Sequence, residues 1–367
     1  MTAVSSPPRR KTVAAPVATV KTLVDAAHSR LLKARVAFGH GTTNAWDEAV
    51  YLVLHALRLP PHELALVLEH KVSAAGRRRA LRLVDARIRR RVPAAYLTHE
   101  AWLGDYRFYV DARAIVPRSF IAELLRDRLA PWLAPRRRIK RALDLCTGSG
   151  CLAVILAKIF PATHVDAVDI SRPALAVARR NVTAYRLQRR IRVLRSDMFS
   201  ALHGERYDLI IANPPYVSAS AMRKLPREYR HEPHLALAGG NDGLDLVRVI
   251  MREAAQYLTA GGLLIVEVGH KRKQIENVYP HLAFVWPQTS GGDDCVFMLW
   301  RGDLERRHGV SSLISNPSPG QRKSVVPSPP TPLPEGEGSI VALARVDRWR
   351  RERRASLSPR GERSEGG

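Results

Sequence analysis

The sequence predicts an α/β protein: a doubly wound, mostly parallel sheet of seven strands, with a small helical domain before it. Two observations support this fold class. From Ile139 onward, short apolar runs alternate with helix-length amphipathic runs, which is typical of βαβ units in a parallel sheet. Ahead of them, apolar residues recur at helical spacing, as in Val50, Leu54 and Leu57.

Seven segments of the second region have the length and composition of strands. Helix-length amphipathic runs over Cys151–Ile159 and Pro173–Tyr185 separate the first of them, and the last two are expected to end the sheet in a hairpin. The predicted strands are Lys140–Cys146, Thr163–Asp169, Ile191–Ser196, Tyr207–Ala212, Leu263–Val268, Ala283–Trp286 and Val296–Trp300.

Changes in composition divide the chain into five expected segments. Pro60 and Pro61 interrupt the helical pattern, and aromatic and β-branched residues around Gly104 and Asp105 indicate a hairpin. The end of the chain is rich in Pro, Ser and Arg and too poor in apolar residues to fold, so we assign no chemistry to it. The segments are a mobile leader (1–19), a helical substrate-binding domain (20–95), a hairpin and linker (96–138), the sheet domain (139–302) and a disordered tail (303–367).

Composition excludes several classes of protein. The chain has 367 residues, of which 46% are hydrophobic and 25% charged, as in ordinary globular proteins. No stretch approaches 18 uninterrupted apolar residues and no signal peptide is evident, so we expect a cytoplasmic protein that does not span a membrane. Three widely spaced cysteines (Cys146, Cys151, Cys295), without the spacing of zinc ligands, argue against a disulfide scaffold and against a zinc site, and we expect no metal-binding residues. The sequence indicates no oligomeric state.

The net charge of +25 predicts contact with a polyanion, most simply nucleic acid or a nucleoprotein particle. More than half of it, +14, belongs to residues 1–138. Eight arginines lie within Arg77–Arg91. They form either a solvated helix face or a surface that docks on RNA, where arginine makes bidentate contacts to phosphate.

A glycine-containing turn follows the first predicted strand, and acidic residues follow the next two. Gly148 and Gly150 allow a sharp turn and close approach of a ligand. Asp169 lies where a carboxylate can accept hydrogen bonds from both hydroxyls of a ribose. Asp197 could contact an adenine amino group. Because the carboxyl ends of parallel strands meet at one edge, the three elements predict an adenosine pocket. They do not show whether the pocket binds a nicotinamide dinucleotide or S-adenosylmethionine.

The tetrapeptide Asn213-Pro214-Pro215-Tyr216 directly follows the strand Tyr207–Ala212. A planar NH₂ group is a poor nucleophile because its lone pair is delocalised. The Asn213 side-chain oxygen and the Pro214 carbonyl could accept its two hydrogens, and the Tyr216 ring could lie against the flat group. Two prolines hold the backbone rigid and remove competing donors. No general base is evident, so catalysis would come from alignment with a sulfonium methyl and exclusion of water.

These motifs resemble a known family. Residues 139–300 resemble the class I S-adenosylmethionine-dependent methyltransferases, with their Rossmann-like fold, and the bridge from Tyr96 to Leu124 resembles that of the protein-(glutamine-N(5)) methyltransferases. Within that family, Phe38–Ala49, Asp144–Cys151 and Tyr229–Pro233 are similar to the branch acting on large-subunit ribosomal protein L-three. The resemblance implies S-adenosylmethionine as methyl donor and a glutamine amide of a ribosomal protein as acceptor.

The expected site residues form two groups. Cys146 is expected to be a small loop residue rather than a nucleophile, and Met198 packs either on adenine or in the core. Phe120 departs from the proline that this branch tends to have. The expected catalytic residues are Asn213, Pro214, Pro215 and Tyr216, and the expected cofactor-binding residues are Asp144, Cys146, Thr147, Gly148, Ser149, Gly150, Asp169, Asp197 and Met198.

Three alternatives remain open at the level of sequence. Peptide chain release factors also carry a glutamine acceptor, so the same chemistry could act on them. Adenine in DNA or RNA presents a flat NH₂ group too, although base chemistry in a duplex needs flipping and usually a larger reading domain. A non-catalytic RNA-binding protein on a degenerate nucleotide fold would explain the arginines, but not the intact glycine turn, Asp169 and Asn213 together.

Overall fold

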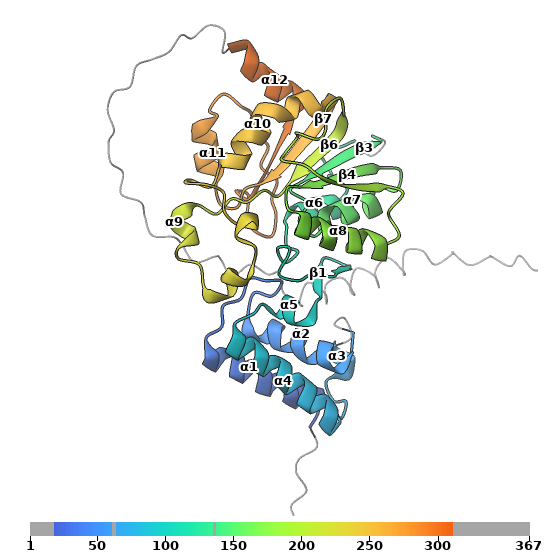
Figure 1. Ribbon diagram of the computed structural model, residues 1–367, viewed down its shortest axis with the longest axis vertical. Helices are drawn as coiled ribbons and strands as arrows, with labels where there is room; N and C mark the ends of the chain where they lie inside the picture. The colour runs from blue at the N-terminus through green and yellow to red at the C-terminus, as the bar shows by residue number, and fades with distance from the viewer. Residues whose placement is uncertain (1–17, 61–63, 135–136, 311–367) are drawn as a thin grey trace, which may run out of the picture.

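The computed structural model describes residues 18–60, 64–134 and 137–310, and shows a helical domain below a larger sheet domain (Figure 1). Most of the predicted leader and of the predicted tail lies outside these residues. No helix within the described ranges is long and apolar enough to cross a membrane. The helical domain comprises α1 (Val20–Ala34), α2 (Ala45–Leu57), α3 (Leu64–Val67), α4 (Ala74–Arg90) and α5 (Ala94–Thr98).

Polar side chains begin the three longer helices of this domain. Thr19, Asn44 and Ser73 each accept a hydrogen bond from a backbone N–H in the first turn of α1, α2 and α4, which satisfies donors that have no partner inside the helix. The apolar faces of the three helices then pack together around buried residues such as Val24 and Leu54. The helical domain therefore has its own core.

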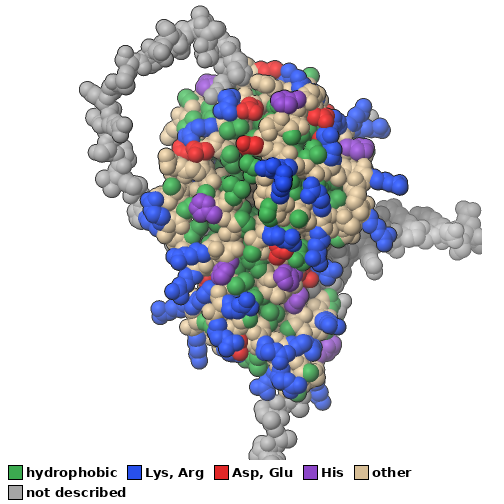
Figure 2. Space-filling model, in the orientation of Figure 1, with side chains coloured by type: hydrophobic (Ala, Val, Ile, Leu, Met, Phe, Trp, Pro, Cys, Tyr) green, Lys and Arg blue, Asp and Glu red, His purple; other side chains and the backbone are tan. Residues whose placement is uncertain are grey.

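The arginines of α4 do not form one continuous exposed face. Arg87 is fully buried: its Nε lies 2.7 Å from Glu48 Oε1, and its Nη2 donates to the carbonyl of Ala37. Arg91, after α4, is half-buried and donates to the carbonyl of Ala34. Arg87 is therefore not available to a surface that docks on RNA, and Arg91 is tied to the fold; contact of the other arginines with RNA stays a prediction. Lys and Arg side chains gather over the lower end of the molecule in Figure 2, and the exposed members of the run are Arg77, Arg78, Arg79, Arg82, Arg89 and Arg90.

A hairpin and a short helix join the two domains. The antiparallel strands β1 (Ala101–Leu103) and β2 (Tyr106–Phe108) turn at Gly104 and Asp105, as the sequence predicts. Helix α6 (Ile121–Arg126) then packs against the sheet domain.

The sheet has the order β5-β4-β3-β6-β7-β8, and only β8 runs antiparallel to its neighbour. This confirms the predicted doubly wound, mostly parallel fold. Its order places the ends of β3 and β6 side by side at the centre. The strands are β3 (Arg141–Leu145), β4 (His164–Asp169), β5 (Ile191–Arg195), β6 (Tyr207–Ala212), β7 (Leu258–Glu267) and β8 (Val296–Trp300), and the helices are α7 (Cys151–Ile159), α8 (Arg172–Ala184), α9 (Ala219–Met222), α10 (Asp245–Tyr257), α11 (Arg272–Val278) and α12 (Arg301–Val310).

Helices cover both faces of the sheet (Figure 1). Alternate residues of each central strand point to opposite faces, because the side-chain period of a strand is two. Ala142 and Leu209 pack with α6, α7 and α8, whereas Leu143 and Ile210 pack with α10, α11 and α12. Both layers are fully buried at these positions, so the sheet is a rigid platform for the loops at its edge.

The predicted strand Ala283–Trp286 is not a regular strand, so the described part of the chain forms a sheet of six strands rather than the predicted seven. Val285 alone forms an antiparallel bridge, exchanging two backbone hydrogen bonds with Met298 of β8. Pro287 follows this segment, and proline cannot donate to a strand ladder. The aromatic residues that suggested a strand instead pack with one another: Phe284 and Trp286 both contact the ring of Phe297.

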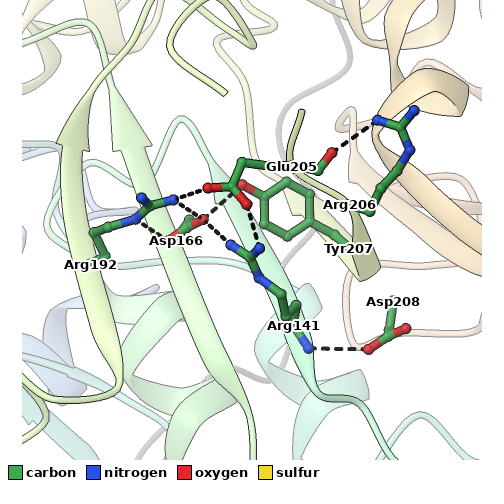
Figure 3. Close-up of polar contacts among 7 residues, drawn as sticks. All are labelled: Arg141, Asp166, Arg192, Glu205, Arg206, Tyr207 and Asp208. Atoms are coloured by element: carbon green, nitrogen blue, oxygen red, sulfur yellow. Dashed lines mark hydrogen bonds and ion pairs between the residues drawn. The ribbon is translucent and has the colours of Figure 1, made fainter. Parts of the chain in front are cut away.

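An ion-pair network ties the strands together at the end of the sheet remote from the glycine turn (Figure 3). The buried Asp166 carboxylate accepts hydrogen bonds from Arg141, from Arg192 and, at 2.8 Å, from the Tyr207 hydroxyl. Glu205 pairs with the same two arginines. The network links β3, β4, β5 and β6, so the four strands keep their relative positions.

Helix α12 extends the folded domain beyond the predicted boundary at residue 302. The expectation of disorder is wrong for residues 303–310, which belong to this helix. The stretch is polar on average, but it contains one side chain that anchors it to the core. Leu304 is 1% exposed and packs in the core shared with α10 and β7.

Replacing Leu304 by alanine should therefore lower the free energy of unfolding by about 2–4 kcal/mol, through lost burial and the cavity left behind. Chemical denaturation of the full chain measures this difference. The neighbouring Glu305, an exposed partner of Arg301, gives a matched control. Glu305→Ala should change stability by less than about 0.5 kcal/mol. Equal effects of the two substitutions would contradict an anchoring role for Leu304.

Candidate active site

A cavity of about 1350 Å³ opens at the carboxyl edge of the sheet. In parallel α/β sheets this edge is the usual place for ligands. The residues that follow β3, β4, β5, β6 and β7 all contribute to its wall, and so do the hairpin and the loop between α1 and α2. Of the residues that the sequence predicts for the site, the cavity is lined by Cys146, Gly148, Asp169, Asp197, Met198, Asn213, Pro214, Pro215 and Tyr216.

The glycine turn between β3 and α7 has left-handed backbone at three positions, with φ of 61° at Cys146, 55° at Gly148 and 78° at Gly150. Gly150 also lies close to α8: a Cβ added there would approach the backbone of Ala178 to 3.2 Å. Gly150 is thus required both for its conformation and for close packing of the turn against α8.

Four of the predicted cofactor-binding residues do not line the cavity: Asp144 at the end of β3, and Thr147, Ser149 and Gly150 within the turn. Asp144 is buried, and its Oδ2 accepts hydrogen bonds from Thr147 Oγ1 at 2.5 Å and from the N–H of Ala153 at 3.0 Å. Burial raises the pKa of Asp144 to about 7. The Ser149 carbonyl accepts from Asn181 in α8. In this arrangement these residues shape the turn.

Asp169 ends β4 with its carboxylate facing the turn. Its Oδ2 accepts from the N–H of Gly148 at 2.9 Å, and its Oδ1 accepts from the N–H of Ser171 at 2.9 Å. Burial raises its pKa, while these backbone donors oppose that shift. Each carboxylate oxygen can accept more than one hydrogen bond, so the group retains acceptor capacity toward the cavity.

Residues after β5 complete this half of the cavity. Asp197 is exposed, whereas Met198 is buried, and its Sδ lies 4.0 Å from Cys146 Sγ. Burial raises the pKa of the Cys146 thiol well above its ordinary value, which disfavours the thiolate, the nucleophilic form of the group.

Asn213 follows β6 and has a defined orientation. Its Nδ2 donates to the backbone carbonyl of Arg118 at 3.2 Å, so its Oδ1 is the atom left to accept a hydrogen bond from a ligand. Pro214 is buried and fixes the chain beside it. The Tyr216 ring lies against Gly269, where an added Cβ would approach the ring to 2.9 Å, and burial raises the pKa of its hydroxyl.

Glu267, at the end of β7, is a cavity residue that the sequence analysis missed. Val266 pairs with Ala212 across β6 and β7, so Glu267 and Asn213 leave the sheet at the same level. Its Oε2 accepts from Ser119 Oγ at 2.6 Å and from the N–H of Phe120 at 2.8 Å, and burial raises its pKa to about 7. The sequence shows a glutamate near the end of a predicted strand. Only the strand order shows that this strand lies next to the one before Asn213.

The raised pKa of Glu267 should make stability depend on pH. Between about pH 4.5 and 7 the folded protein holds a proton that the unfolded chain has lost, so the free energy of unfolding falls as pH rises through this window. Glu267→Gln keeps an acceptor oxygen and removes the titration. From pH 4.5 to 8, the wild type should lose on the order of 2–3 kcal/mol more than the variant. Urea unfolding at both pH values measures this, and equal losses would contradict the assignment.

All three cysteines are free. Cys295 Sγ lies 3.5 Å from Oδ1 of its sequence neighbour Asp294, and the fold also brings it to 3.6 Å from His270 Nδ1. These three side chains could together contact a metal ion. His270 and Asp294 are also hydrogen-bonded to each other at 3.0 Å.

Comparison with known proteins identifies relatives of this chain. Residues 124–227 match the family model "Methyltransferase small domain". The chain is 54% identical to the ribosomal protein uL3 glutamine methyltransferase of Bordetella pertussis, over 78% of this chain and 96% of that protein. It is 50% identical to the protein of the same name from Neisseria meningitidis, over 78% and 94%. Among solved structures, it is similar to a methyltransferase from Pyrococcus furiosus (17% identity, TM-score 0.40, covering 53% of this chain and 88% of that one).

The curated relatives and the matched family model identify an S-adenosylmethionine-dependent methyltransferase, built on a doubly wound sheet with a cavity at its carboxyl edge. The curated relatives, which this chain matches over nearly their whole length, define the particular family. The chain belongs to the family of ribosomal protein uL3 glutamine methyltransferases.

Proposed function

We propose that this protein transfers a methyl group from S-adenosylmethionine to the side-chain amide nitrogen of a glutamine in ribosomal protein uL3. One observation carries the proposal: the relatives that share half of its residues over nearly their whole length are named for this reaction. The orientation of Asn213 adds chemical support, because Asn213 lines the cavity and its Nδ2, not its Oδ1, makes the hydrogen bond to Arg118. A ribosomal substrate would place the reaction in the cytoplasm.

The residues present fit the methyl donor. We assign Asp169 to the ribose hydroxyls, because its carboxylate retains acceptor capacity toward the cavity. Met198 offers an apolar surface to the adenine ring, and Asp197 an acceptor for its amino group. Gly148 leaves room for close approach at the turn, while Asp144, Thr147, Ser149 and Gly150 act indirectly by holding that turn. When bound, S-adenosylmethionine supplies an electrophilic methyl group on its sulfonium.

The acceptor amide would be held by Asn213 and the adjoining backbone. Asn213 Oδ1 and the Pro214 carbonyl accept the two amide hydrogens, which orients the nitrogen lone pair toward the methyl group. Rigid acceptors are effective because they need no reorganisation during the reaction. Tyr216 covers the flat group. We assign Glu267 to the proton that the methylated amide releases, since its carboxylate borders the same cavity.

Transfer of labelled methyl from S-adenosylmethionine to three purified acceptors tests the proposed function. The acceptors are unmodified uL3, a peptide chain release factor and nucleic acid. We expect label on uL3. Label on the release factor alone would retain the chemistry and change the substrate. Label on nucleic acid alone would contradict a protein acceptor.

We further propose that the exposed arginines of α4 contact ribosomal RNA around the target. In support of this, Arg78 and Arg82 are exposed and make no ion pair within the described residues. Replacing both with glutamine should lower affinity for a ribosomal particle on the order of tenfold at low salt and weaken its salt dependence. Methylation of isolated uL3 should be unchanged.

Arg186 and Arg189, exposed beyond α8, provide a control with the same loss of charge. Filter binding to ribosomal particles at several salt concentrations measures all three proteins. If the double substitution in α4 and the control weaken binding equally, net charge and not this surface determines the affinity.

A further inference from the structure

Two sequence segments with no role in the mechanism above meet at the boundary of the domains. One is the loop before α2, Phe38–Asn44, and the other is Tyr229–Pro233, in the region of 3-10 turns between β6 and α10. The rings of His40 and Tyr229 pack with their centroids 4.2 Å apart. A Cβ on Gly39 would approach the Tyr229 hydroxyl to 2.4 Å, so only glycine permits this packing. The helical domain is therefore in direct contact with a loop that lines the cavity.

Glu232 is the charged centre of this junction. It is buried, and it accepts two parallel hydrogen bonds from Arg118, Nη1 to Oε1 at 2.8 Å and Nη2 to Oε2 at 2.7 Å. The N–H of Val116 also donates to Oε1 at 3.1 Å, and His40 Nε2 lies 3.5 Å from Oε2. Burial alone would raise the pKa of Glu232, but Arg118 and His40 outweigh it and lower the pKa to about 2. Glu232 is thus a fixed anion at neutral pH.

Arg118 connects this anion to the reaction site. Its guanidinium is held by Glu232, and its backbone carbonyl accepts the hydrogen bond from Asn213 Nδ2 that sets the direction of Oδ1. Glu232 also holds the backbone at Val116, two residues before Arg118. A two-pronged pair with additional backbone support restricts rotation as well as distance. The position of the Arg118 carbonyl therefore depends on Glu232.

We propose that Glu232 is a positioning residue for methyl transfer: through Arg118 it fixes the Asn213 amide. This inference rests on the proposed function and deepens it, because it gives the Tyr229–Pro233 segment a role: its Glu232 holds the residues that position the acceptor amide. Small displacements of a positioning group can cost about 100-fold in rate.

The test compares Glu232→Gln with a matched control, Glu228→Gln. Glu228 lies four residues earlier and joins the same loop to Arg87, Arg91 and the N–H of Ala37, but it does not contact Arg118. We expect Glu232→Gln to lower kcat about 10- to 100-fold with the Kd of S-adenosylmethionine unchanged within about twofold. Glu228→Gln should keep kcat within about twofold. Equal kcat losses in both variants would show that general stability of the junction, and not positioning, is responsible.

A second measurement separates positioning from folding. Asn213→Asp retains an acceptor oxygen but lacks the N–H donor to the Arg118 carbonyl. In this background Glu232→Gln should cause little further loss of kcat, because the connection it acts through is already broken. Fully multiplicative losses would overturn the proposal. If Glu232→Gln does not fold, Arg118→Lys, which ends the two-pronged pair, takes its place in the same cycle. Wild-type turnover on uL3 is measured first, so a failure of the proposed function is seen separately.

Discussion

Asn213→Ala is expected to reduce methyl transfer by roughly 100- to 1000-fold while S-adenosylmethionine still binds. A loss of this size is typical when one preorganised hydrogen-bonding group is removed from a reaction site. Asn213 Oδ1 is the acceptor that its hydrogen bond to the Arg118 carbonyl leaves free, and alanine supplies no replacement. The adenosine half of the cavity is built by the turn after β3 and by Asp169, which this substitution does not touch. Turnover assays and calorimetric titration with the cofactor measure the two properties on the same protein.

Thermal unfolding of the Asn213→Ala variant provides the control for this experiment. Asn213 is only half-buried, and its side chain makes a single hydrogen bond within the described residues, so the unfolding temperature should change little. A folded variant with near-normal turnover would remove Asn213 from the mechanism. A variant that has lost cofactor binding as well would mean that the two halves of the cavity are not independent.

Asp169→Ala is expected to weaken binding of S-adenosylmethionine by roughly 10- to 100-fold. Hydrogen bonds to a charged group contribute about 1.5–3 kcal/mol each, and the ribose would lose its acceptor. The alanine also leaves the N–H groups of Gly148 and Ser171 without their partner, so the turn itself should loosen. Equilibrium titration with the cofactor and with its demethylated product measures the loss.

Asp169→Asn gives an intermediate case. Asparagine keeps one acceptor oxygen in place of two, so it can satisfy some but not all of the backbone N–H groups and ribose hydroxyls. Its affinity should fall between those of the wild type and the alanine variant. An alanine variant that binds S-adenosylmethionine as tightly as the wild type would refute the assignment of Asp169.

The sheet was predictable because periodicity and composition are local properties of the chain. The runs before Cys146, Asp169 and Asn213 are short, apolar and followed by turn residues, and all three are strands. The prediction was wrong where the same local pattern of residues is compatible with two different structures. Aromatic residues at 283–286 resemble a strand but pack as an aromatic cluster, and the polar stretch after residue 302 contains one buried anchor, Leu304.

The site was predictable only as far as strand ends determine it. The carboxyl ends of parallel strands meet in space, so the turn at Gly148, Asp169 and Asn213 could be brought together from the sequence alone. The orientation of each side chain could not. Asp144 carries the chemical character of a ligand contact, yet it faces the interior and holds Thr147.

Residues contributed by loops were invisible for a different reason. Glu232 and Arg118 are 114 positions apart and meet only because the loop after β6 folds back across the hairpin linker. No periodic pattern predicts that contact. Arg87 illustrates the same difficulty, since other arginines of α4 such as Arg82 and Arg89 are exposed while Arg87 pairs with Glu48 inside the helical domain.

Peptide mass mapping of uL3 after incubation with the enzyme and S-adenosylmethionine identifies the residue that receives the methyl group. We expect the added mass of one methyl group on a single glutamine side chain, present with the wild type and absent with Asn213→Ala. Methylation at lysine, arginine or a chain terminus, or no modification of uL3 beside clear modification of another acceptor, would contradict it.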